Sequence, residues 1–60
     1  MIVHSNSKCY VERCFIPYDN RGNGKFEFFI DRNDGKNLRV VNSRDKAIDL
    51  ACKYKNGEKI

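Results

Sequence analysis

Hydrophobic and polar residues alternate along two neighbouring stretches, residues 25–32 and 37–41, with the period of two that β-strands show. A short polar segment, Asn33-Asp34-Gly35, separates them and has the composition of a hairpin loop. The hydrophobic positions that we expect on the buried face of this hairpin are Phe26, Phe28, Ile30, Leu38 and Val40. The pattern therefore predicts an antiparallel β-hairpin in the middle of the chain.

The length of the loop decides which residues of the hairpin pair. A two-residue turn at Asp34-Gly35 would pair Ile30 with Arg39 and would mix the two faces. A three-residue loop pairs Ile30 with Leu38 and keeps the hydrophobic positions together. We therefore predict the three-residue loop, with Gly35 in the left-handed conformation.

A helical pattern follows the hairpin almost at once. Asn42 or Ser43 can cap a helix over residues 44–56, and Gly57 can take the left-handed position that ends it. The hydrophobic residues that recur at helical spacing are Ala47, Ile48, Ala51 and Tyr54. We expect this stripe to pack on the buried face of the hairpin.

Residues 8–16 predict a third strand, whose orientation is less clear because both faces carry a charged residue. We expect Val11 and Phe15 to point inward, since the opposite face would bury Glu12 without a partner. Arg13 shares the chosen face, and its long stem would let its charge reach solvent at an edge.

The remaining segments complete the predicted fold. Residues 1–3 are a short hydrophobic start that suits an edge strand, residues 4–7 read as a turn, and residues 18–24 as a polar loop. The sequence predicts one α+β domain over residues 1–60. Its core architecture is a three-stranded antiparallel sheet, with room for a short N-terminal fourth strand, and one C-terminal helix packed on one face.

The amino-acid composition indicates which classes of protein this chain can belong to. Hydrophobic residues at 40% and charged residues at 33% are typical of a globular chain. No hydrophobic run approaches the length of a membrane span or a signal peptide, so we expect a cytoplasmic protein that does not bind membranes. Three cysteines, an odd number, favour reduced thiols. The net charge of +4 permits binding to polyanions, but acidic residues lie throughout the chain.

A metal site is one candidate chemistry. Cys9 and Cys14, with His4 and Cys52 as further ligands, would make a Cys₃His zinc site. However, a regular strand would place Cys9 and Cys14 on opposite faces and about 17 Å apart. We therefore predict no metal and treat the cysteines as small hydrophobic residues.

Two loop segments resemble ligand-binding motifs only superficially. Gly22-Asn23-Gly24-Lys25 has the composition of a phosphate loop, but a strand follows it where a phosphate loop needs a helix. Asp31, Asn33 and Asp34 lack the spacing of a calcium loop and suit a turn. A domain this small seldom encloses a substrate pocket, so we predict no cofactor, no small-molecule substrate and no enzymatic activity.

Two functions remain, and both use the sheet face that the helix leaves uncovered. We expect a protein-interaction regulator or inhibitor, with a protein partner or a second copy docking on the uncovered face or on an edge strand. The residues predicted to contact the partner are Glu27, Phe29, Arg39 and Val41. The alternative is a DNA-binding protein that lays the sheet into the major groove. The residues predicted to touch phosphates are Arg13, Arg21, Lys25 and Arg32.

Overall fold

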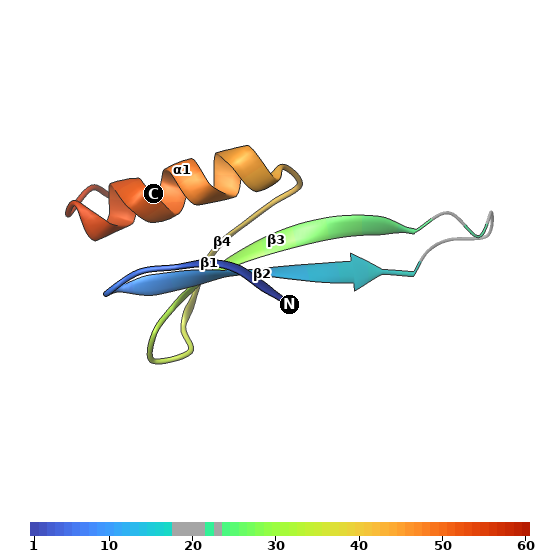
Figure 1. Cartoon of the computed structure of the whole chain (residues 1–60), viewed down its shortest axis with the longest axis horizontal. Coiled ribbons are helices and arrows are strands. Elements are labelled where there is room, and N and C mark those ends of the chain that lie inside the picture. The colour runs from blue at the N-terminus through green and yellow to red at the C-terminus, as the bar shows by residue number, and fades with distance from the viewer. Residues whose placement is uncertain (18–21, 23) are drawn as a thin grey trace.

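The computed structural model of the protein describes residues 1–17, 22 and 24–60, so most of the predicted loop at 18–24 lies outside it. The elements in chain order are β1 (Ile2–Ser5), β2 (Cys9–Ile16), β3 (Lys25–Arg32), β4 (Asn37–Val41) and α1 (Arg44–Lys55). The strands form one antiparallel sheet in the order β1-β2-β3-β4, and α1 lies across one of its faces (Figure 1). The predicted α+β class, the N-terminal fourth strand and the C-terminal helix are confirmed.

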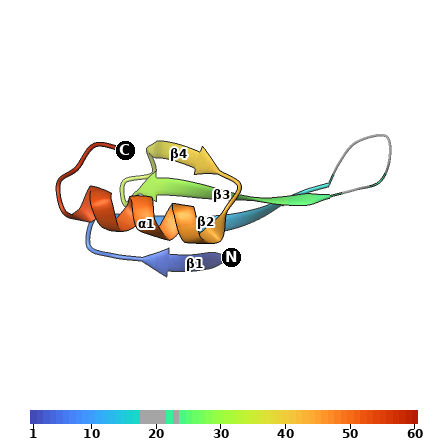
Figure 2. The ribbon, with the colours of Figure 1, turned by 90° about the horizontal axis from the view of Figure 1, so that it is seen from above.

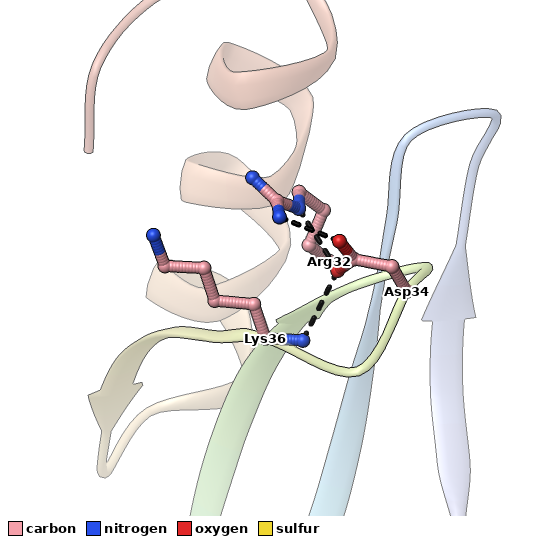
Figure 3. A network of polar contacts seen from close by, with 3 residues as sticks. All are labelled: Arg32, Asp34 and Lys36. Carbon is pink, nitrogen blue, oxygen red and sulfur yellow. Dashed lines mark hydrogen bonds and ion pairs between the residues drawn. The ribbon is translucent and has the colours of Figure 1, made fainter.

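The loop between β3 and β4 has the predicted three-residue form. The Gly35 amide donates to the Arg32 carbonyl at 2.7 Å, the Arg32 amide donates to the Lys36 carbonyl at 2.8 Å, and Gly35 has a φ of 98°. The Asp34 carboxylate stabilises the loop by accepting hydrogen bonds from the residues on both sides of it. Its Oδ1 accepts from the Arg32 Nε at 2.9 Å and from the Lys36 amide at 3.2 Å (Figure 3).

A bulge in β4 changes the pairing that the loop alone would give. Ile30 pairs with Arg39 and Phe28 with Val41, so the predicted pairing of Ile30 with Leu38 was wrong. Leu38 is the extra residue, and the register shifts across it. Leu38 and Val41 are three positions apart, yet both pack against the core, which a strand of period two would not permit.

Asp34 gives the loop a testable pH dependence. The Arg32 guanidinium, followed by the Lys36 amide, lowers the pKa of Asp34 from 3.8 to about 2. A carboxylate whose pKa is lowered by folding stabilises the folded state above its unfolded pKa, and that stabilisation is lost as the pH falls towards 2. We expect the free energy of unfolding, measured by urea denaturation, to fall more steeply for the wild type than for Asp34→Asn as the pH is lowered from about 4 to about 2. Identical slopes would show that the loop carboxylate does not contribute.

Capping groups fix both ends of α1, as the sequence predicts. The Ser43 hydroxyl accepts from the Lys46 amide at 3.4 Å, which identifies Ser43, and not Asn42, as the N-cap. Gly57 follows the helix with a φ of 91°, and its amide donates to the Tyr54 carbonyl. The helix therefore begins and ends within one residue of its predicted bounds.

The core between the sheet and α1 is small. Its buried hydrophobic residues are Cys9, Val11, Phe28, Ile30, Ala47 and Ala51. The two alanines allow the helix backbone to approach the sheet closely, since they have the smallest side chains after glycine. Val11 faces the helix, so the predicted orientation of β2 is confirmed at that position.

Three residues predicted to be buried are exposed instead: Phe15 by 55%, Phe26 by 45% and Val40 by 41%. Phe15 and Phe26 pair with each other on the helix side of the sheet, but α1 does not reach them. An eight-residue strand is about 26 Å long and the 12-residue helix about 18 Å, so the end of the β2–β3 hairpin extends past α1 (Figure 2). Val40 is exposed because the bulge turns it to the opposite face, where it pairs with Phe29.

Asn6 ties the turn between β1 and β2 to the helix. Its Oδ1 accepts from the amides of Lys8 and Cys9, each at 2.9 Å, and its Nδ2 donates to the Ala51 carbonyl at 3.2 Å. β1 continues to Ser5, so this turn begins two residues later than predicted. One side chain thereby links two segments that are 45 residues apart in the sequence.

Candidate interaction surfaces

One face of the sheet has no helix over it, and we call it the open face (Figure 1). Strand alternation and pairing assign to this face Ile2, Ser5, Tyr10, Glu12, Cys14, Ile16, Lys25, Glu27, Phe29, Asp31, Asn37 and Val40. Phe29 pairs with Glu12 on β2 and with Val40 on β4, so its half-buried ring lies in the middle of the sheet. Val40 is exposed beside it, and Ile2 is exposed on β1, with Glu12 between Ile2 and Phe29. The open face thus has a hydrophobic centre.

Two of the four residues predicted to form the partner surface lie on the open face, and two do not. Glu27 and Phe29 face away from α1, as predicted. Arg39 and Val41 pair with the buried residues Ile30 and Phe28 and therefore belong to the helix side, so their predicted placement was wrong. The cause is the bulge at Leu38, because a shift of one residue reverses the facing of the residues that follow it.

The charges of the open face are mostly negative. It carries the carboxylates of Glu12, Glu27 and Asp31. The Lys25 Nζ lies 3.8 Å from the Glu27 Oε2, and the N-terminal ammonium of Met1 lies 3.8 Å from the Glu12 Oε2. Partial burial, followed by the Asp31 and Glu12 carboxylates, raises the pKa of Tyr10. Three carboxylates and two cations leave this face with a small negative excess, on a protein whose net charge is +4.

The helix side carries an exposed aromatic cluster where the β2–β3 hairpin extends past α1. The rings of Phe15 and Phe26 meet edge to face with their centroids 5.2 Å apart. The Arg13 guanidinium lies over the Phe26 ring, with its Cζ 4.6 Å from the centroid. We call these three residues the aromatic overhang. The prediction that Arg13 shares a face with Phe15 is confirmed, although its charge stacks on a ring instead of reaching out at an edge.

A pocket of about 310 Å³ adjoins the overhang, at the point where β4 leads into α1. Its lining residues are Lys25, Glu27, Arg39, Val40, Val41, Asn42 and Lys46. Three cations and one carboxylate line the pocket, so its potential is positive. Val41 pairs with Phe28, the next residue after Phe26 on the helix side of β3, which places this part of the pocket near the overhang. Lys25, Glu27 and Val40 belong to the open face, so the pocket lies at the β4 edge of the sheet.

The residues predicted to contact phosphates do not form one surface. Arg13 belongs to the overhang and Lys25 to the pocket beside it. Arg32 lies at the other end of β3, about 23 Å from Lys25, and pairs with Asp34. Arg21 lies outside the described residues.

The cysteines lie apart in the fold. Cys9 is buried under α1, with its Sγ donating to the Ala51 carbonyl at 3.7 Å, and burial raises the pKa of its thiol. Cys14 lies on the open face and Cys52 is exposed on α1. His4 is half-buried on β1, with an Nε2 that has no hydrogen-bond partner among the described residues. Within the described part of the chain, no three His, Cys, Asp or Glu residues gather as metal ligands.

Sequence reasoning missed the aromatic overhang because it treated Phe15 and Phe26 as core residues. The signal that would have found it is the difference in length between the strands and the helix, about 26 Å against about 18 Å. A helix too short to cover the hairpin must leave the last hydrophobic pair of the hairpin exposed.

Comparisons with protein-family models, curated proteins and solved structures found no match. In the described residues, no helix has the length and hydrophobicity needed to cross a membrane.

Proposed function

We propose that the protein is a non-enzymatic binding module, a regulator or inhibitor that docks on a partner protein through its open face. The partner contributes a hydrophobic patch surrounded by lysine or arginine side chains. A standard interface of about 800 Å² per partner would take roughly a fifth of the 4247 Å² surface of this chain. One broad face of the sheet is the natural place for a contact of that size.

The observation that carries this proposal is the half-buried Phe29 ring at the centre of an uncovered sheet. Val40 is 41% exposed beside it and Ile2 is 58% exposed on the outer strand β1. A central aromatic residue with hydrophobic neighbours and a polar rim is the usual composition of a protein-binding hot spot. The described part of the chain has one sheet, and no second layer packs on the face that carries these side chains.

The carboxylates around Phe29 decide which kind of partner fits. DNA docking on this face would bring its phosphates against Glu12, Glu27 and Asp31, which like-charge repulsion opposes. A symmetric dimer through this face would place the same three carboxylates against their copies. The negative excess that remains beside the Glu12 and Glu27 ion pairs attracts a partner with a basic rim, so a different protein is favoured over a second copy.

A pull-down with two matched variants tests the proposal. We expect Phe29→Asp to weaken binding of the specific partner by roughly 30-fold or more, because it removes the central ring and adds a charge that the hydrophobic patch cannot accommodate. Phe26→Asp, an equal change on the opposite side of the sheet, should leave binding unchanged. Bound proteins are identified by mass spectrometry, and the affinity of the purified partner is then measured by calorimetry. Circular dichroism confirms that both variants are folded.

Two results would refute the proposal. The first is a partner that wild type, Phe29→Asp and Phe26→Asp bind with equal affinity. The second is a wild type that sediments as a dimer and becomes monomeric only on Phe29→Asp, which would make a second copy the occupant of the open face.

A further inference from the structure

The aromatic overhang exposes parts of two aromatic rings and one cation beyond the end of α1. Phe15 and Phe26 remain 55% and 45% exposed although they lie on the same face as the core. The Phe15 ring covers Gly24 so closely that a Cβ at that position would overlap with it. Glycine thus allows the ring to lie flat along the hairpin, and the neighbouring Phe26 ring supports it at an angle of 63°.

The Arg13 guanidinium lies against these rings, whereas the carboxylates of β2 and β3 (Glu12, Glu27 and Asp31) lie on the other face of the sheet. Arg13 stacks on Phe26 and forms no ion pair among the described residues, and its Nη2 donates to the Met1 Sδ at 3.6 Å. The sulfur is a weak acceptor, so an anion can replace it as the partner of the guanidinium. Arg39 and Lys46 line the adjoining pocket, in which Glu27 is the one carboxylate among the lining residues. Proteins bind single-stranded nucleic acid with two elements: exposed aromatic rings, on which bases stack, and cations, which contact the phosphates.

We propose that the aromatic overhang and the pocket beside it bind single-stranded nucleic acid. Bases stack on Phe15 and Phe26, and the phosphates between them contact Arg13, Arg39 and Lys46. Stacking requires unpaired bases, so a duplex of the same sequence presents no free ring face to the overhang. The rings, Arg13 and Arg39 lie on the helix side, and the pocket shares Lys25, Glu27 and Val40 with the edge of the open face. The proposed stacking on Phe15 and Phe26 does not depend on the protein-binding function.

Fluorescence anisotropy with a labelled oligo-dT of about 15 nucleotides tests the site, because single-stranded sites of this kind span about 4–16 nucleotides. We expect Phe26→Leu and Phe15→Leu each to weaken binding by roughly fivefold or more, since leucine keeps the hydrophobic contact and removes the ring face. Arg13→Gln should weaken binding and make its salt dependence shallower by about one unit of the log–log slope. Tyr10→Leu, which removes an aromatic ring from the open face, is the matched control and should bind as the wild type does.

Any one of three results would overturn the proposal. Absence of binding at low salt would do so directly. Equal binding by wild type, Phe15→Leu and Phe26→Leu would show that the rings take no part. Equal affinity for oligo-dT, for its duplex with oligo-dA and for a poly-glutamate peptide of the same charge would show attraction by net charge alone. Circular dichroism melting curves establish that each variant is folded before its affinity is compared.

Discussion

Ile30→Ala should unfold a large share of the molecules under conditions in which the wild type is folded. Ile30 is fully buried on β3, a strand with a neighbour on each side and the helix above it. Truncating a buried isoleucine to alanine costs about 2–5 kcal/mol. A 60-residue domain has a total stability of only about 3–9 kcal/mol. Urea unfolding followed by circular dichroism measures the loss, since the chain has no tryptophan for fluorescence.

Val40→Ala is the matched control for this substitution. Val40 lies on the neighbouring strand but is 41% exposed on the open face, so its truncation should change stability by less than about 1 kcal/mol. Similar losses for Ile30→Ala and Val40→Ala would mean that both faces of the sheet are equally buried in solution, contrary to the arrangement described above.

Asn6→Ala should cause the second-largest loss, about 2–4 kcal/mol. The substitution removes the acceptor of the Lys8 and Cys9 amides and the donor to the Ala51 carbonyl, and a typical hydrogen bond contributes about 0.5–1.5 kcal/mol net. The Cys9 amide and the Ala51 carbonyl belong to buried residues, so water replaces the lost partner poorly. Urea unfolding gives the size of the effect, and hydrogen exchange of the α1 amides shows whether the helix loosens first.

Asn37→Ala provides the comparison for Asn6→Ala. Asn37 makes one exposed hydrogen bond between its Nδ2 and the Asp31 Oδ1, at 2.8 Å, so its removal should cost less than about 1 kcal/mol. If the two asparagine variants unfold at the same urea concentration, the Asn6 side chain does not hold the turn to the helix.

The fold class was predictable because several local signals agree. Alternation in residues 25–32, the loop ending in Gly35 and the Ser43 cap each indicate the same hairpin and helix. The β4 bulge was not predictable in this way. It depends on Leu38 and Val41 packing together against a helix that follows β4 after only two residues, and that is a property of the assembled fold.

The surfaces were predictable only in part, because some of their residues depend on the β4 bulge and on the length of α1. Phe29 and Glu27 lie on β3, whose alternation is regular, and both face as predicted. Arg39 and Val41 follow the bulge, so their facing depended on a register that the sequence pattern did not determine. The exposure of Phe26 depended on the length of α1 relative to the hairpin, a comparison between two elements that periodicity within either one does not make.

The two faces of the sheet therefore differ in charge, and only one of them is packed by α1. The open face combines hydrophobic residues with carboxylates, and the overhang combines aromatic rings with cations. A small domain with two unlike faces is suited to contact two unlike partners. On this account, the open face contacts a basic protein surface while the overhang contacts a polyanion.

The cysteines of the chain provide the most direct test of the central claim, that the open face is the protein-contact surface. Cys14 lies on that face, Cys52 is exposed on α1 and Cys9 is buried, so alkylation rates read by mass spectrometry report on three locations at once. We predict that the partner protein slows alkylation of Cys14 and leaves that of Cys52 unchanged. Slower alkylation of Cys52, with Cys14 reacting as in the free protein, would contradict the account.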